Sequence, residues 1–178
     1  MFRLIYFIYL YHHVKFEHMK LLTHEIKISV FQSEELPDEF TQLVEKAKAQ
    51  TQNSYAPYST FNVGAALLLD NDEIICGSNQ ENSAYPSGIC AERVAMFYAN
   101  SLFPKVAVKA MAIAAHTHGH FLTEPITPCG ACRQVLLESE NRYNKDIKII
   151  LYGVEKTYIL ENVKQLLPLS FGKSNLEL

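Results

Sequence analysis

The sequence predicts a layered α/β domain, and two observations support this prediction. Segments of strand character alternate with segments of helical spacing along the chain, which is typical of a sheet covered by helices. The chain has 178 residues, of which 48% are hydrophobic, so one domain with a sizeable core is expected.

The first predicted elements are a short strand and a helix. Residues 26–30 alternate between apolar and polar side chains, which indicates a strand. Ser33 is a suitable helix cap, and Glu34 and Glu35 would then lie in the first turn, at the positive end of the helix dipole. Apolar residues follow at helical spacing, so we expect this helix to end near Asn53.

The remaining predicted elements continue the alternation. An Asp70-Asn71-Asp72 turn predicts a hairpin between two strands, and Pro125 and Pro128 mark a loop. The sequence predicts strands at 61–69, 73–78, 109–116 and 147–152, and helices at 91–101, 130–140 and 162–167.

Composition and charge exclude some partners. A formal net charge of -3 and a pI near 6.2 argue against binding to a nucleic acid polymer, which favours a basic surface. The 16 Lys and Arg residues form no long basic run, which argues against attachment to a membrane surface.

The N-terminus is expected to lie outside the main domain. The apolar run at 4–11 is shorter than the roughly 20 residues that span a bilayer, and no A-x-A cleavage site follows it. We therefore interpret residues 1–33 as an extension of a domain at 34–178. Met19 is the preferred functional start, with residues 1–18 incidental to the fold.

The cysteines predict a zinc site. Cys129 and Cys132 lie three residues apart at the start of a predicted helix, and Cys90 starts an earlier one. Three protein ligands and one open position are typical of catalytic zinc. Cys76 lies inside a predicted strand, so we interpret it as a core residue. The C-x-x-C spacing favours a reducing compartment and therefore a cytoplasmic location.

Charged residues beside these cysteines suit a catalytic role. Glu92 can pass protons to and from a metal-bound water. Arg93 is the first candidate for a donor to a ligand sulfur, and Arg133 is the second. A structural zinc site remains an alternative, with a fourth ligand from the histidines at 116, 118 and 120, although such a cluster is more often a polar loop. A redox pair is a further alternative, but it leaves Cys90 and Glu92 unexplained.

Four motifs resemble the small cytidine deaminase family. They are CAER at 90–93, PCGACRQ at 128–134, YAPYSTFNVGAA at 55–66 and NQENSAY at 79–85. The first two match the zinc-deaminase signature in its three-cysteine form. The resemblance extends over residues 36–171, and the loop that holds the three histidines is longer than is usual in the family.

The resemblance implies a fold, a cofactor and an assembly. It implies a three-layer sandwich in which helices flank a mixed β-sheet, one Zn²⁺ per subunit and a homotetramer. Its implied substrate residues hold the ribose (Asn79 and Glu81), pack on the pyrimidine (Phe61), read the base edge (Ala91 and Glu92) and reach in from a neighbouring subunit (Tyr85 and Phe171).

The activity implied is hydrolysis of cytidine and deoxycytidine to uridine and deoxyuridine with release of ammonia, as in pyrimidine salvage. Zinc-bound hydroxide would attack C4 of a free nucleoside while Glu92 shuttles protons. A deaminase acting on a nucleoside antibiotic or on a base within RNA is one alternative. A zinc-stabilised interaction module with four protein ligands and no pocket is another.

Overall fold

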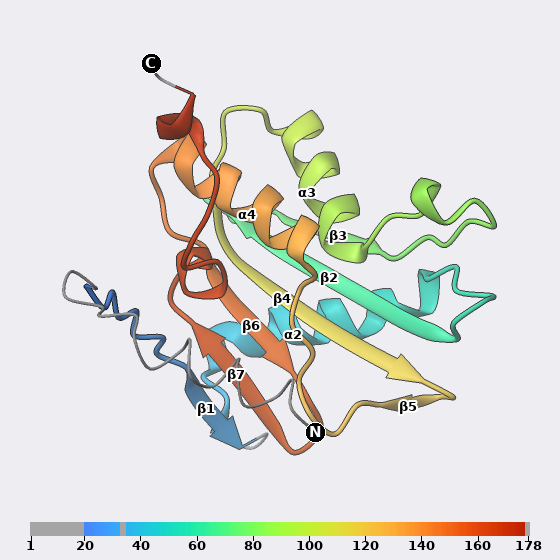
Figure 1. The fold of residues 1–178 in the computed structure, drawn as a ribbon. Helices are drawn as coiled ribbons and strands as arrows, with labels where there is room; N and C mark the ends of the chain where they lie inside the picture. Colours follow the sequence, from blue (N-terminus) through green and yellow to red (C-terminus); the bar gives the residue numbers. More distant parts are fainter. Residues whose placement is uncertain (1–19, 33–34, 177–178) are drawn as a thin grey trace, which may run out of the picture.

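The computed structural model describes residues 20–32 and 35–176 (Figure 1). In these residues seven strands form one mixed sheet, in the order β1-β7-β6-β4-β2-β3 with β5 paired to β4. The strands are β1 (Ser29–Gln32), β2 (Phe61–Leu69), β3 (Ile74–Ser78), β4 (Val108–Thr117), β5 (His120–Phe121), β6 (Lys148–Tyr152) and β7 (Lys156–Leu160). The α-helices are α2 (Asp38–Gln50), α3 (Ala91–Leu102) and α4 (Gly130–Tyr143).

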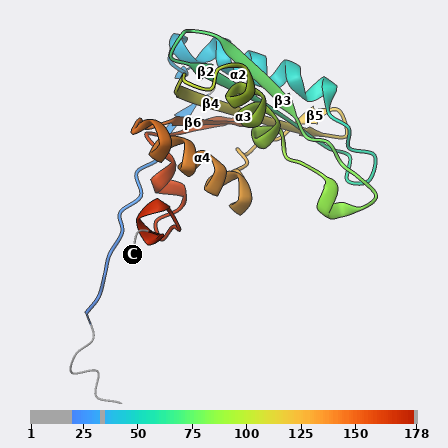
Figure 2. The ribbon, with the colours of Figure 1, turned by 90° about the horizontal axis from the view of Figure 1, so that it is seen from above.

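Helices cover both faces of the sheet, so the predicted three-layer α/β fold is confirmed. β4 and β6 run parallel and the other pairs are antiparallel, which makes the sheet mixed. Helix α2 lies on one face, and α3 and α4 lie on the other (Figure 2). Alternate residues of β2 point to opposite faces. Leu67 therefore joins the core cluster that includes Met96 of α3, and Ala66 joins the cluster that includes Leu43 of α2.

Two glycines bring helices unusually close to the sheet. A Cβ on Gly64 would lie 2.1 Å from the carbonyl oxygen of Ala47 in α2. A Cβ on Gly77 would lie 2.5 Å from the backbone nitrogen of Ala95 and 2.7 Å from the oxygen of Ala91. The first turn of α3 thus rests directly on β3, and this contact fixes where α3 begins.

The predicted strand at 26–30 is wrong in its position. The strand is β1, at 29–32, and it pairs antiparallel with β7 at one edge of the sheet. Ile26 and Ile28 precede it and are about half exposed, at 48% and 47%. Alternation indicates a strand only where a neighbouring strand can pair with it, and here pairing begins at Ser29.

Helix α2 starts later than predicted. Ser33 and Glu34, the expected cap and first-turn residue, lie outside the described residues, and the helix begins at Asp38 with Pro37 as its N-cap. A proline disfavours helical geometry in the residue before it, so a helix starting at residue 34 could not run through this position. The first turn carries Asp38 and Glu39 instead. A 3₁₀ turn, Thr51–Asn53, follows α2, so the predicted end near Asn53 is confirmed.

The other predicted elements agree with the structure to within a few residues, and the hairpin of β2 and β3 is confirmed. The predicted helix at 162–167 is a 3₁₀ turn, Val163–Leu166. Strands β5 and β7 were not predicted. In β7 the run Thr157, Tyr158 and Ile159 after Gly153 carries the β-branched and aromatic signal of a strand, and β5 has two residues only.

The predictions for the N-terminus concern residues that mostly lie outside the part of the chain that the structure describes. Met19 and residues 1–18 lie outside the described residues. Within 20–32 and 35–176, no helix has both the length and the apolar character needed to cross a bilayer.

Candidate metal centre and cavity

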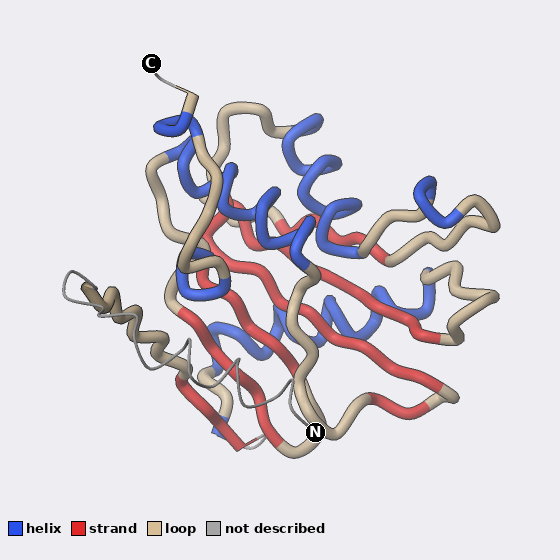
Figure 3. Tube along the Cα trace, in the orientation of Figure 1, coloured by secondary structure: helices blue, strands red, loops and turns tan. Residues whose placement is uncertain are grey.

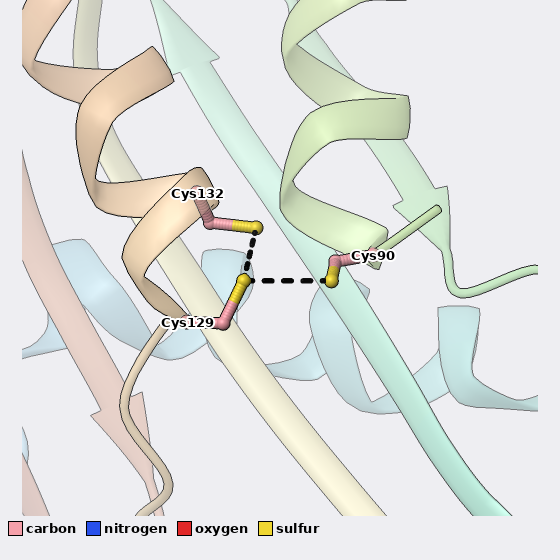
Figure 4. Close-up of side chains that lie close together, drawn as sticks. All are labelled: Cys90, Cys129 and Cys132. Atoms are coloured by element: carbon pink, nitrogen blue, oxygen red, sulfur yellow. Dashed lines mark hydrogen bonds between the residues drawn. The ribbon is translucent and has the colours of Figure 1, made fainter. Parts of the chain in front are cut away.

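The three predicted cysteine ligands meet at the N-termini of two helices. Cys90 is the N-cap residue of α3, Cys129 is the N-cap residue of α4, and Cys132 lies in the first turn of α4. Their side chains point toward one another from the two helices (Figure 4). The Sγ atoms of Cys90 and Cys129 are 3.7 Å apart, and those of Cys129 and Cys132 are 3.4 Å apart.

This geometry fits a zinc ion. Three sulfurs at a Zn–S distance of about 2.3 Å in tetrahedral geometry lie about 3.8 Å from one another. The three Sγ atoms all lie within 4.8 Å of one another, so small side-chain adjustments suffice. Within the described residues this is the one group of three or more His, Cys, Asp or Glu side chains that could hold a metal. No histidine joins it, so the fourth ligand that a structural site requires is absent from this part of the chain.

The surroundings of Cys90 favour its thiolate form, whereas the hydrogen bond with Cys90, followed by burial, raises the pKa of Cys132. Neither Cys90 nor Cys129 uses its side chain as a helix cap, so the positive ends of α3 and α4 face the cluster. Arg93 Nη2 lies 3.9 Å from Cys90 Sγ and donates to it. Hydrogen bonding from Cys132, followed by that from Arg93, lowers the pKa of Cys90 to about 5. Arg93 therefore lies where the sequence predicted a donor to a ligand sulfur.

Arg133 does not have the position proposed for a second such donor. Its guanidinium donates to the backbone oxygens of Pro128 and Leu166 and to the hydroxyl of Thr127. These acceptors lie on the loop before α4 and on the last residue of the Val163–Leu166 turn. Arg133 therefore donates to backbone oxygens and a hydroxyl and not to a ligand sulfur.

Glu92 is buried beside the cluster. It is 5% exposed, and burial raises the pKa of its carboxyl, with the charge of Cys90 adding to the increase. Its side chain also has a hydrogen-bonding interaction with Cys132. A carboxyl with a raised pKa, close to the metal ligands, is well suited to accept and return protons.

A cavity of about 750 Å³ opens directly over this cluster. Cys90, Cys129, Glu92 and Arg93 line one part of it. Residues at the start of β2 and just before it, in the segment after β3 and in the loop before α4 line the rest. The predicted residues Phe61, Asn79, Glu81 and Tyr85 are all in the lining. A pocket beside three sulfurs is not expected of a zinc module that only stabilises an interaction surface.

Hydrogen bonds hold the two polar candidates for ribose binding in place. Asn79 Oδ1 accepts from Ser54 Oγ and from the backbone N–H of Val63, and Nδ2 donates to Phe61 O at 2.8 Å. A carboxamide has two N–H groups, so one remains for a ligand. Glu81 accepts from the hydroxyl of Ser59 and from the N–H of Tyr58, and these bonds lower the pKa of its carboxyl.

Comparison with known proteins identifies the family. Residues 38–145 match the model of the cytidine and deoxycytidylate deaminase zinc-binding region. The chain belongs to the family of zinc-dependent cytidine deaminases.

Individual relatives agree with this assignment. The chain is 40% identical over 134 residues to a cytidine deaminase of Sporosarcina psychrophila, covering 75% of this chain and 92% of that protein. It is 39% identical over 129 residues to one of Halalkalibacterium halodurans, covering 72% of this chain and 91% of that protein. The crystal structure of a cytidine deaminase from Burkholderia pseudomallei superposes with a TM-score of 0.62 at 36% identity, covering 73% of this chain and 97% of that one.

Two predicted substrate residues of this cytidine deaminase lie outside the cavity lining. Ala91 is fully buried behind Cys90 in the first turn of α3. Phe171 is 58% exposed, and its backbone oxygen accepts a hydrogen bond from Gln134 Nε2 at 2.9 Å. Tyr85 was predicted to reach the site of a neighbouring subunit. Here its ring makes an edge-to-face contact with the ring of Tyr58, with the ring centroids 6.3 Å apart, and both residues line the cavity of their own chain.

The sequence did not indicate part of the cavity lining, and it left undecided whether a histidine supplies a fourth zinc ligand. Tyr58, Ser59 and Thr127 line the cavity, and their positions shortly before Phe61 and Cys129 were the available signal. Cys76 is free and packs against the core cluster beneath α2, so its prediction as a core residue is confirmed. His116 lies at the end of β4 in an edge-to-face contact with Phe121, in the β4–β5 hairpin and outside the metal cluster.

Proposed function

We propose that this protein hydrolyses the amino group of free cytidine and deoxycytidine, giving uridine or deoxyuridine and ammonia. The observation that carries this proposal is the cluster of Cys90, Cys129 and Cys132 beside the buried Glu92 at a cavity of about 750 Å³. One molecule of water is consumed for each ammonia released.

Cys90, Cys129 and Cys132 would hold the zinc ion. A bound zinc ion supplies the acidity that makes a water molecule available as a nucleophile for C4 of the base. Glu92 accepts a proton from this water and transfers one to N3, which makes C4 more electrophilic. As the water oxygen bonds to C4, Glu92 takes the second proton of this oxygen and transfers it to the amine. The C4–N bond then breaks, ammonia leaves, and the oxygen stays as the carbonyl at C4 of the product. Burial raises the pKa of Glu92 toward the working pH, which suits a group that must both accept and donate protons.

The other substrate residues that the resemblance implies would position the nucleoside. The carboxylate of Glu81 and the remaining amide N–H of Asn79 are proposed to bind ribose hydroxyls, one as acceptor and one as donor. Phe61 is proposed to pack on the pyrimidine ring, and the backbone of Ala91 to read the base edge together with Glu92. Arg93 supports this chemistry by withdrawing charge from Cys90.

A homotetramer is proposed as the working assembly. Exposed apolar side chains on α3 support it, because Phe97, Tyr98 and Leu102 are 48%, 53% and 48% exposed. Tyr85 and Phe171, 77% and 58% exposed, are proposed to complete a neighbouring subunit's site. Light scattering on the zinc-loaded protein should give the mass of four chains, and a monomeric mass would contradict the assembly.

The proposed setting is pyrimidine salvage in the cytoplasm. The four cysteines are all free, which suits a reducing compartment. We propose residues 34–178 as the catalytic domain and 1–33 as an extension whose last residues add β1 to the sheet.

The test is a deamination assay with zinc-loaded protein. The near-ultraviolet absorbance of cytidine should change as uridine forms, with release of ammonia, and a chelator should abolish the change. Deoxycytidine should also react, whereas a cytosine within an RNA oligonucleotide should not.

Substitution of Glu92 tests the proton shuttle separately. The Glu92→Ala variant should lose turnover by at least about 10²–10⁴-fold while retaining zinc. Glu138→Ala, an exposed change on α4, is the matched control and should leave activity unchanged. Full turnover in Glu92→Ala would refute the proposed proton shuttle.

A further inference from the structure

The loop that delivers Cys129 to the cluster has little regular structure of its own. It runs from the end of β5 to the start of α4 without a strand or helix (Figure 3). Its beginning is tied to the β6–β7 turn, where the N–H of Val154 donates to Leu122 O at 2.9 Å. Its end contains Pro125 and Pro128, which have no backbone N–H to donate. Cys129 itself is exposed and is the residue next to Pro128.

All three guanidinium nitrogens of Arg133 donate hydrogen bonds, and two of them bind the end of this loop. Nε donates to Pro128 O at 2.8 Å, and Nη2 donates to Thr127 Oγ1 at 3.0 Å. Nη1 donates to Leu166 O at 2.8 Å. The planar guanidinium fixes the directions of these bonds relative to one another, which a lysine ammonium on a flexible stem cannot reproduce.

The third acceptor anchors the arrangement in the core. Leu166 is 9% exposed and belongs to the hydrophobic cluster beneath α3 and α4. Arg133 thus links a position fixed by core packing to the two residues that precede Cys129. Displacement of the Pro128 carbonyl would move Cys129 out of its 3.4 Å and 3.7 Å contacts with the other two sulfurs.

We propose that Arg133 is a positioning residue for the zinc site, which acts by fixing the Thr127–Pro128 backbone so that Cys129 is held ready for the metal. The inference rests on the proposed zinc role of Cys129. It assigns the two arginines different tasks, because Arg93 donates to a ligand sulfur and Arg133 donates to backbone and a hydroxyl around a ligand.

The test is the rate of zinc release from the full-length protein into a chromogenic chelator, measured without substrate. Arg133→Lys should release zinc about 10–100-fold faster than wild type, which is the usual effect of losing a group that orients a ligand. Thr127→Val removes one of the three bonds, so its effect should be smaller and should not add fully to that of Arg133→Lys. Cobalt substitution provides a second readout, because the sulfur-to-metal absorption of Arg133→Lys should be altered.

Arg142→Lys is the matched control. Arg142 also donates to a backbone oxygen, that of Pro104 at 3.0 Å, but it lies at the end of α4 opposite to Cys129. It should release zinc at the wild-type rate. Equal release rates in Arg133→Lys and Arg142→Lys would overturn the inference, even if both variants melt at lower temperature. If Arg133→Lys does not fold, a rate of zinc release from Thr127→Val equal to that of wild type would overturn the inference. Failure of wild type to bind zinc at all would instead refute the proposed function.

Discussion

Glu140 offers a stringent test of how the C-terminal part of the chain is held. It is 2% exposed in α4, and its Oε1 accepts from the backbone N–H groups of Ile147 at 2.8 Å and Val163 at 2.7 Å. One carboxylate oxygen therefore joins α4, the entry to β6 and the 3₁₀ turn that contains Leu166. Glu140→Ala would leave both buried N–H groups without an acceptor.

The expected loss can be worked from these two bonds. A buried donor left without a partner costs about 1–3 kcal/mol, so the free energy of unfolding should fall by about 2–6 kcal/mol. In a protein of this size 1 kcal/mol shifts the melting temperature by about 2–4 °C, so a decrease of roughly 4–24 °C is expected. Glu140→Gln keeps the carbonyl oxygen as an acceptor and should melt within a few degrees of wild type.

The pH dependence has a defined sign. Burial raises the pKa of Glu140, so the protonated form is favoured in the folded state. The stability that this protonated carboxyl contributes is fully present below the unfolded pKa of about 4.3, and it is lost as the pH rises through the folded pKa. The Glu140→Gln variant has no titrating group at this position. The stability of wild type relative to this variant should therefore decrease from acidic toward neutral pH.

The assay is thermal unfolding followed by circular dichroism, with metal-free protein throughout so that protonation of the zinc ligands does not contribute. A loss below about 0.5 kcal/mol in Glu140→Ala, which is the scatter of surface substitutions, would refute the reasoning. Equal losses in the Ala and Gln variants would refute the role of Oε1, and an opposite pH trend would refute the role of burial.

Three other predictions concern the site directly. Gly77→Ala places a Cβ 2.5 Å from Ala95 N, so α3 must move, and calorimetry should show a loss of about 1–3 kcal/mol with faster zinc release. Gly172→Ala, where the nearest atom is 3.5 Å away, is its control and should change neither quantity. Glu81→Gln removes a charged acceptor, so steady-state kinetics should show KM for cytidine about 10–100-fold higher with little change in kcat; an unchanged KM would contradict ribose binding. Removing zinc with a chelator should lower the melting temperature by roughly 10 °C, on the basis of about 4 kcal/mol of linked binding energy at about 1,000-fold excess over Kd; an unchanged melting temperature would contradict a ligated metal.

The central part of the fold could be predicted because its signals are local. The continuous apolar run of β2 and the turn at Asp70–Asp72 define a hairpin without reference to the rest of the chain. The edge strand β1 was harder to place, because its start is set by pairing with β7, which the alternation of residues 26–30 does not show. The start of helix α2 was predicted too early because Ser33 is a favourable cap locally, whereas Pro37 restricts the residue before it.

In the candidate site, side-chain chemistry could be predicted and backbone support could not. The spacing of Cys129 and Cys132 indicates that both can reach one ion, and the sulfur distances agree with this. The task of Arg133 depends on Leu166, which is 33 positions away in the sequence and comes close only through the fold. A motif names the arginine next to a ligand, but it contains no information about which atoms that arginine will reach.

The two halves of the metal centre are held in physically different ways. Cys90 begins a helix that rests on β3 through Gly77, so its position follows from close packing of backbone on backbone. Cys129 follows a loop that contains two prolines, so its position requires hydrogen bonds that come from outside the loop. Packing is enforced by the whole core, whereas the two residues directly before Cys129 are held by the hydrogen bonds of one guanidinium. The Cys129 side is therefore where we expect zinc affinity to be most sensitive to a single substitution that leaves the sulfurs themselves unchanged.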